Sequence, residues 1–205
     1  AGLVTLFLDP ENPATPPPEV MTRRLSKRIP ALFEDRCDAR VIGPGLGRLT
    51  APQAEALLEG LAQDTTPTVL DADALNLLAG SDRLDLLRSH PLITPHPGEF
   101  ARLAPDLAGL PREEAATRFV DRYPCTLLLK GTRTLIATAG RNPRINPTGH
   151  AGMASGGQGD VLSGVCGALL AGGLCPLDAG SWAAWLCGRA AERAITHGGE
   201  SEESC

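Results

Sequence analysis

Residues 146–173, NPTGHAGMASGGQGDVLSGVCGALLAGG, constrain the fold of this chain more than any other stretch. The first half is rich in glycine and holds almost no large side chain. The second half, 161–170, is apolar or small at nearly every position and is followed by Gly172 and Gly173, which predicts a buried helix with a glycine stop. A glycine-rich loop that leads into a helix directs free backbone N–H groups and the positive end of the helix dipole to one point. This arrangement is typical of a phosphate site.

Asp160 lies at the junction between the glycines and the apolar segment. Its carboxylate could cap the helix, or it could face a ligand held by the glycines. The density of glycine before an apolar helix favours the second interpretation. Gly156, Gly157 and Gly159 are therefore candidate anion-binding residues, and Asp160 is a candidate catalytic residue.

Apolar runs of strand length alternate with helical patterns along the rest of the chain. The strands are expected at 3–8, 39–42, 68–70, from 92, and in two runs within 125–138. The helices are expected at 19–27, 50–62, from about Ala74, from Gly98, at 112–122 and at 177–195. This alternation predicts an α/β domain with a mainly parallel sheet and right-handed crossovers. The run at 3–8 is expected to be covered on both faces, and Trp182 and Trp185 are expected in the core or in an interface.

Polar residues follow several of the expected strands, at the edge where open α/β sheets bind ligands. Asp71 and Asp73 follow the strand at 68–70, where either could contact a ligand or Mg²⁺-bound water, or simply cap the next helix. His96 lies between two prolines that fix the direction of its imidazole. Lys130 ends another strand and could reach a phosphate as a point charge, or it could be a solvated hairpin lysine.

Composition excludes several classes of protein. A chain of 205 residues with 42% hydrophobic content is expected to form one domain, and its net charge of −5 without a basic cluster argues against nucleic acid or an anionic membrane as partner. Six cysteines without CxxC spacing argue against a zinc site, so no metal site made by protein ligands is expected. No signal peptide, membrane span or GxxxxGK[ST] motif is found, which predicts a cytoplasmic protein that is not a P-loop NTPase.

The stretch NPTGHxGMASGGxGDVLSG resembles the signature of the ribokinase-like superfamily. Together with GPGLG (43–47), DADALN (71–76), TPHPGE (94–99) and KGTRT (130–134), it is similar to the nucleotide-dependent NAD(P)H-hydrate dehydratases. The resemblance covers most of the chain. It implies a ribokinase-like α/β fold over residues 1–205, with helices on both faces of a mainly parallel sheet, and a homo-oligomer, specifically a homotetramer.

The resemblance also assigns residues to ligands. Gly47, His96 and Asp160 would bind the hydrated cofactor. The nucleotide would contact the glycines at 156, 157 and 159 and the segment Lys130, Gly131, Thr132, Arg133 and Thr134.

The implied reaction returns hydrated NADH or NADPH to the intact cofactor, with ADP or ATP as co-substrate and Mg²⁺ as cofactor. The hydroxyl would be phosphorylated first, with Asp160 handling its proton, and phosphate would then leave. A ribokinase-like kinase that acts on a vitamin-precursor alcohol and a non-catalytic nucleotide-binding module are the two alternatives. Family members begin with an earlier strand and helix and extend further at the other end, so the chain is expected to be a fragment or to be truncated at both ends.

Overall fold

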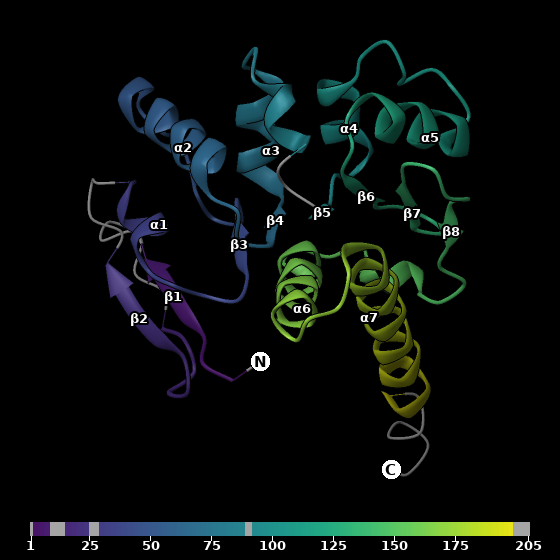
Figure 1. Ribbon diagram of the computed structural model, residues 1–205. Helices are drawn as coiled ribbons and strands as arrows, with labels where there is room; N and C mark the ends of the chain where they lie inside the picture. The colour runs from purple at the N-terminus through teal and green to yellow at the C-terminus, as the bar shows by residue number, and fades with distance from the viewer. Residues whose placement is uncertain (1, 9–14, 25–28, 89–91, 199–205) are drawn as a thin grey trace.

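A six-stranded sheet lies at the centre of the molecule, with helices on both of its faces (Figure 1). The computed structural model describes residues 2–8, 15–24, 29–88 and 92–198. The sheet has the strand order β3-β4-β5-β6-β7-β8, in which β3 to β6 are parallel and β7 and β8 are added antiparallel. The predicted mainly parallel sheet is therefore confirmed. The strands are β3 (Arg40–Ile42), β4 (Thr68–Leu70), β5 (Leu92–Ile93), β6 (Thr126–Leu129), β7 (Leu135–Thr138) and β8 (Arg144–Ile145).

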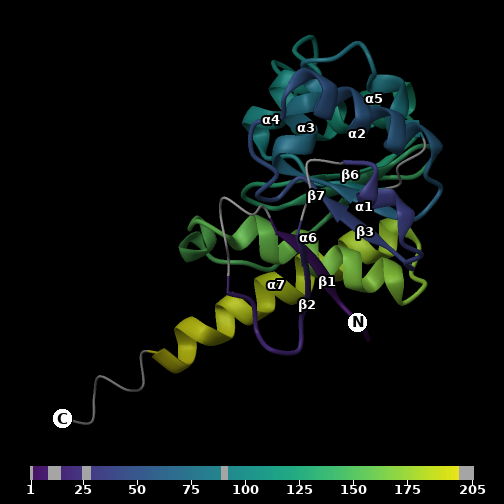
Figure 2. The same cartoon turned by 90° about the vertical axis from the view of Figure 1, so that its left-hand side faces the viewer.

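The helices form two layers that Figures 1 and 2 show on opposite sides of the sheet. One layer holds α2 (Ala51–Gln63), α3 (Ala72–Ala79), α4 (Pro97–Leu103) and α5 (Arg112–Arg122), and the other holds α6 (Gln158–Ala171) and α7 (Pro176–Gly198). The short elements are α1 (Ala31–Glu34), η1 (Leu84–Arg88) and η2 (Ala151–Met153).

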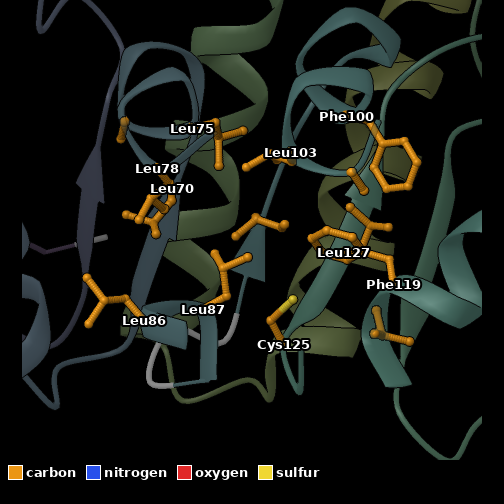
Figure 3. Packing of buried hydrophobic residues seen from close by; sticks show 14 of the residues in the cluster. Leu70, Leu75, Leu78, Leu86, Leu87, Phe100, Leu103, Phe119, Cys125 and Leu127 are labelled. Atoms are coloured by element: carbon orange, nitrogen blue, oxygen red, sulfur yellow. The ribbon is translucent and has the colours of Figure 1, made fainter. Parts of the chain in front are cut away.

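Each face of the sheet has its own hydrophobic cluster. Leu70 and Leu127 point towards α2–α5, where they belong to the cluster that includes Phe100 (Figure 3). Their strand neighbours Val69 and Leu128 belong to the cluster under α6 and α7. Successive strand residues point to opposite faces, so a sheet covered on both sides requires continuous apolar runs. This is why β4 and β6 could be recognised in the sequence.

A separate two-stranded sheet contradicts the helix predicted at 19–27. Residues Met21–Arg24 form strand β2, which pairs in parallel with β1 (Thr5–Leu8) from Thr5 opposite Met21 to Leu8 opposite Arg24. All four side chains of β2 are exposed, so no hydrophobic pattern in the sequence indicates a strand. The backbone pairing with β1 determines the structure here and overrides the local preference for a helix. Residues 25–27 of the predicted helix lie outside the described residues. The strand at 3–8 is only half-buried, so the prediction that both of its faces are covered was also wrong.

Two predictions of burial fail on α6 and α7. Helix α6 begins at Gln158 and buries the face that carries Leu162, Cys166 and Leu170. Val161, on another face of the helix, is 56% exposed. Trp182 is 53% exposed and makes an edge-to-face contact with the half-exposed Trp185. The core interpretation of this tryptophan pair was therefore wrong, and the interface interpretation stays a prediction.

Candidate active site at the carboxyl edge of the parallel strands

Asp71 is the most buried charged residue at the carboxyl edge of the sheet. It follows β4, and its side chain is 1% exposed. Its carboxylate accepts hydrogen bonds from the Ala72 amide at 2.9 Å, from Lys130 Nζ at 2.8 Å and from Ser163 Oγ at 2.6 Å. The first of these bonds caps α3, so the capping alternative for Asp71 is realised. The other two tie β4 to β6 and α6.

The backbone around Asp71 is closely packed at Gly43 and has an unfavourable conformation at Ala72. A methyl group on Gly43, whose φ is +127°, would lie 1.7 Å from the Asp71 carbonyl oxygen, so only glycine fits there. Ala72 has a φ of +47°, which is unfavourable for a residue with a side chain. Backbone of this kind persists where the surrounding structure holds it and is concentrated at functional sites.

Lys130 directly follows β6, and its ammonium lies between two buried carboxylates. Its Nζ lies 2.8 Å from Asp71 Oδ1 and 3.8 Å from Glu99 Oε2. The solvated-hairpin alternative for Lys130 is therefore wrong, because the ammonium lies inside the site. Thr94, which follows β5, extends the polar network with a 3.3 Å contact between its Oγ1 and Ser163 Oγ.

His96 is the N-cap residue of α4. Its Nδ1 accepts hydrogen bonds from the amides of Gly98 at 3.0 Å and Glu99 at 3.3 Å, and its Nε2 lies 3.4 Å from Glu99 Oε1. Glu99 completes a capping box, because its Oε2 accepts from the His96 amide at 2.7 Å. Since Nδ1 is an acceptor, the neutral imidazole carries its proton on Nε2. Half of the His96 side chain remains exposed to a ligand.

The start of α6 lies within the predicted glycine segment, and of the three glycines predicted to bind an anion Gly159 lies in its first turn. Its N-cap is Gly157, with a left-handed φ of +86°, and the amides of the first turn have no partner within the helix. Asp160 is exposed in this turn, and in the part of the chain that the structure describes its carboxylate has no hydrogen-bond or ion-pair partner. Of the two interpretations of Asp160, capping is therefore not observed.

Gly159 brings the helix start next to Lys130. A methyl group on Gly159 would lie 3.4 Å from Lys130 Nζ and 3.9 Å from Asp71 Oδ2. The ammonium thus lies next to the first turn of α6, the turn that also carries Asp160. The amides and the ammonium favour an anion, and the free carboxylate can accept a proton.

The other predicted binding residues lie around this centre. Gly47, with a φ of +70°, donates its amide to Asp73 Oδ2 at 2.9 Å, which places the GPGLG loop against the start of α3. The segment after Lys130 is held from beneath by Arg112, which donates to the carbonyls of Thr132 at 2.7 Å, Leu129 at 3.1 Å and Lys130 at 3.2 Å. Gly131, Thr132 and Arg133 are exposed and Thr134 is partly buried, and the Thr134 carbonyl accepts a hydrogen bond at 2.8 Å from the amide of Asn146, the first residue of the glycine-rich stretch.

The glycine loop is anchored on α7 before it reaches the site. Thr148 donates to the Trp185 carbonyl at 3.2 Å, and the Gly149 amide donates to Glu192 Oε1 at 2.8 Å. This backbone hydrogen bond holds the pKa of Glu192 below its ordinary value. Gly188 permits the contact, since a methyl group there would lie 2.2 Å from Thr148 Oγ1.

Sequence reasoning missed Glu99 and Ser163, and it did not pair Asp71 with Lys130. Glu99 could have been found, because it lies three residues after His96 at the capping-box position. Ser163 is a polar residue on the apolar face of α6, three positions after Asp160, and this was the available signal. No local pattern indicates the pairing of Asp71 with Lys130.

Two features are absent from the described ranges. No cluster of three or more His, Cys, Asp or Glu residues that could hold a metal ion occurs among them. In the same ranges, none of the helices combines the length and hydropathy needed to cross a membrane.

The fold is that of a ribokinase-like α/β protein, with the start of helix α6 next to Lys130 at the carboxyl edge of the sheet. Residues 1–204 match the model of the NAD(P)H-hydrate dehydratase family, and the chain belongs to that family. It is 40% identical over 192 residues to the bifunctional NAD(P)H-hydrate repair enzyme Nnr of Moorella thermoacetica, a match that covers 92% of this chain and 36% of that enzyme. The chain thus spans about a third of the length of this curated relative.

Solved structures agree with this assignment. The ADP/ATP-dependent NAD(P)H-hydrate dehydratase of Bacillus subtilis, co-crystallised with ATP and Mg²⁺, superposes with a TM-score of 0.71 at 30% identity, over 87% of this chain and 64% of that one. A hydroxyethylthiazole kinase of Pyrococcus horikoshii superposes with a TM-score of 0.59 at 19% identity, over 80% of this chain and 67% of that one, which supports the fold alone.

Proposed function

We propose that this chain carries the nucleotide-dependent dehydratase activity that returns hydrated NADH or NADPH to the intact cofactor, with ADP or ATP as co-substrate. The observation that carries this proposal is the position of Lys130 Nζ beneath Gly159, at the helix start where Asp160 is unpaired. This arrangement supports a bound anion that the Lys130 ammonium and the amides of the first turn of α6 contact from two sides. The Asp160 carboxylate would then act as a base next to the anion. Membership of the dehydratase family and the ATP/Mg²⁺ complex of the Bacillus subtilis relative support the choice of ligands.

The chemical difficulty of the reaction is that hydroxide is a poor leaving group. In the proposed mechanism Asp160 accepts the proton of the cofactor's hydroxyl while the hydroxyl oxygen attacks the terminal phosphoryl group. The bond from that phosphorus to the bridging oxygen breaks, and the nucleotide leaves one phosphate shorter. The amides of Gly156, Gly157 and Gly159 and the Lys130 ammonium stabilise the negative charge on the phosphoryl oxygens. The C–O bond then breaks, phosphate leaves with the electron pair, and the adjacent ring carbon loses a proton to form the double bond.

The remaining predicted residues position the two ligands. Gly47 and His96 contact the hydrated nicotinamide, and the segment 131–134 contacts the nucleotide. Arg112 supports this nucleotide role, because its hydrogen bonds to the carbonyls of Leu129, Lys130 and Thr132 fix the backbone at the start of the segment without using its side chains. Positioning is the main source of rate in reactions of this kind.

The donor set fits a Mg²⁺ ion that is held mainly by nucleotide phosphates. Mg²⁺ commonly keeps several waters and takes one or two carboxylates together with substrate phosphates. Asp73, through water, is the carboxylate that this chain would provide. When bound, the ion would neutralise phosphate charge during transfer.

We also propose that residues 1–205 act as one cytoplasmic domain in a homo-oligomer, specifically a homotetramer. The exposed pair Trp182 and Trp185 on α7 supports an interface between subunits.

The test is to mix the full-length protein with Mg²⁺, hydrated NADH and either ADP or ATP, and to follow the absorbance of reduced nicotinamide. We expect absorbance to return with at least one nucleotide and to fail without any. No return with either nucleotide would reject the proposal. Accumulation of a stable phosphorylated alcohol would instead indicate a small-molecule kinase.

A further inference from the structure

We propose that Glu99 is a positioning residue that holds the His96 imidazole for the substrate and moderates the charge of Lys130 towards the nucleotide. The proposal rests on the proposed function. It gives Glu99 a role in turnover beyond its role in the capping box.

The Glu99 carboxylate connects the two halves of the site. Its Oε2 accepts from the His96 amide at 2.7 Å and lies 3.8 Å from Lys130 Nζ, while its Oε1 lies 3.4 Å from His96 Nε2. The side chain is 6% exposed, so water does not screen these interactions as it does at the surface. Glu99 is thus the residue that contacts both His96 and Lys130.

A purely structural role does not require a charged residue at this position. Glutamine completes a capping box as well as glutamate does. Asp71 already neutralises the Lys130 ammonium at 2.8 Å, so Glu99 adds a second buried carboxylate to one lysine. Burial of an extra negative charge opposes folding. Function therefore accounts for the charge better than the cap does.

The two carboxylate oxygens of Glu99 have different partners, and a glutamine cannot replace both. In Glu99→Gln the amide oxygen would keep the bond from the His96 amide. The NH₂ group would then face the protonated Nε2 of His96, donor against donor. The cap at Nδ1 would remain, but Nε2 would face a donor in place of the carboxylate, and the ring would shift. The loss of negative charge next to Lys130 would at the same time strengthen the attraction of its ammonium for phosphate.

Two effects of opposite sign are therefore expected from Glu99→Gln in the full-length protein. The dissociation constant of ADP, measured by calorimetry with Mg²⁺, should fall by about 2- to 5-fold because a repelling charge is removed. The kcat for hydrated NADH should fall by about 10- to 100-fold because the imidazole is misplaced. The midpoint of thermal unfolding should not fall below that of the wild type, because the cap remains and a buried charge is removed. Glu59→Gln, an exposed position on α2, is the matched control and should change none of these values.

A cycle with His96→Asn separates positioning from other effects. Asparagine also caps helices, so this variant keeps the helix start. If Glu99 acts through His96, Glu99→Gln should lower kcat in the wild type but not in the His96→Asn background. An unchanged kcat in Glu99→Gln, or weaker ADP binding with a lower unfolding midpoint, would overturn the proposal.

Failure of the proposed function would be recognised separately. A wild-type protein that does not convert hydrated NADH rejects the dehydratase activity, and two readouts without turnover then decide the role of Glu99. These are the ADP dissociation constant and the ¹⁵N resonance of His96 Nε2, which should shift in Glu99→Gln and stay in Glu59→Gln. An unshifted Nε2 resonance would reject the role of Glu99 whatever the reaction of the protein is.

Discussion

Lys130 Nζ lies 2.8 Å from Asp71 Oδ1, although the two residues are 59 positions apart in the chain and follow different strands. The side chain of Asp71 is almost fully buried, and the carboxylate of Glu99 lies close to the same ammonium. A change of Lys130 should therefore affect both stability and the proposed anion site, since Lys130 is the counter-ion of Asp71 and also the cation beneath the start of α6.

Lys130→Met is expected to destabilise the protein by about 3 kcal/mol or more, because it leaves Asp71 buried without its counter-ion. Urea denaturation measures this change. The double variant Lys130→Met/Asp71→Asn should recover part of the lost free energy of unfolding without recovering turnover. Unchanged stability of the single variant would show that the ion pair makes no net contribution.

Asp160→Asn is expected to abolish most turnover while leaving the fold intact. The side chain is exposed and makes no described contact, so the free energy of unfolding should change by less than about 0.5 kcal/mol. Loss of the base should lower kcat by about 100-fold or more. Asp121→Asn on α5, which is also exposed, is the control and should keep full activity. A turnover rate within a factor of two or so of the wild type would exclude Asp160 as the base.

Gly159→Ala and Gly164→Ala should differ although both lie in α6. A methyl group on Gly164 meets open space, so alanine should stabilise the helix by about 0.5–1 kcal/mol and leave activity unchanged. A methyl group on Gly159 lies over Lys130 Nζ, where the phosphoryl oxygens are proposed to bind. ADP binding should therefore weaken by about 10-fold or more in calorimetry. Equal affinities of the two variants would place the nucleotide elsewhere.

Asp64 is expected to make stability depend on pH in the acidic range. Partial burial opposes its ionisation, but hydrogen bonds from Thr66 and Arg40 outweigh this effect and hold its pKa below the ordinary value of 3.8. The folded state thus binds fewer protons than the unfolded state. The contribution of Asp64 is complete above the ordinary value and is lost as the pH falls through the lowered pKa.

Asp64→Asn should therefore cost about 1–3 kcal/mol at neutral pH and less in acid. Urea denaturation at a series of pH values measures the difference between the two proteins. A difference that stays constant down to the most acidic pH would contradict the assigned pKa shift.

Cys125 and Cys166 are expected to resist alkylation in the native protein. Burial raises the pKa of each thiol to about 12, and the thiolate is the form that reacts. The exposed Cys37 and Cys175 should be modified first by iodoacetamide, as mass spectrometry of peptides would show. Modification of Cys166 before unfolding would indicate that α6 opens from the sheet.

Elements that are determined locally were predictable from the sequence. Helix α2 begins at Thr50 with a capping box to Gln53 and a proline in the first turn, and its expected range was close to the observed one. The apolar runs of β4 and β6 are continuous because helices cover both faces of the sheet. The capping of α3 by Asp71 was also among the alternatives that the sequence left open.

Features that depend on distant partners were not predictable. Strand β2 has only exposed side chains, so its pairing with β1 leaves no hydrophobic pattern to read. Gly157, and not Asp160, is the N-cap residue of α6, since its left-handed backbone starts the helix without a side-chain cap. The network of Lys130, Asp71 and Ser163 joins segments that only the completed sheet brings together.

The parallel arrangement of β3 to β6 has a consequence for how the molecule would respond to an occupant. Neighbouring parallel strands are reached through crossover helices, so residues 71, 96, 130 and 160 converge only in the assembled sheet. A nucleotide bound among them would contact residues that are far apart in the sequence. Its binding would accordingly raise the free energy of global unfolding. Amide hydrogen exchange would then slow throughout the sheet and not only beside the bound molecule.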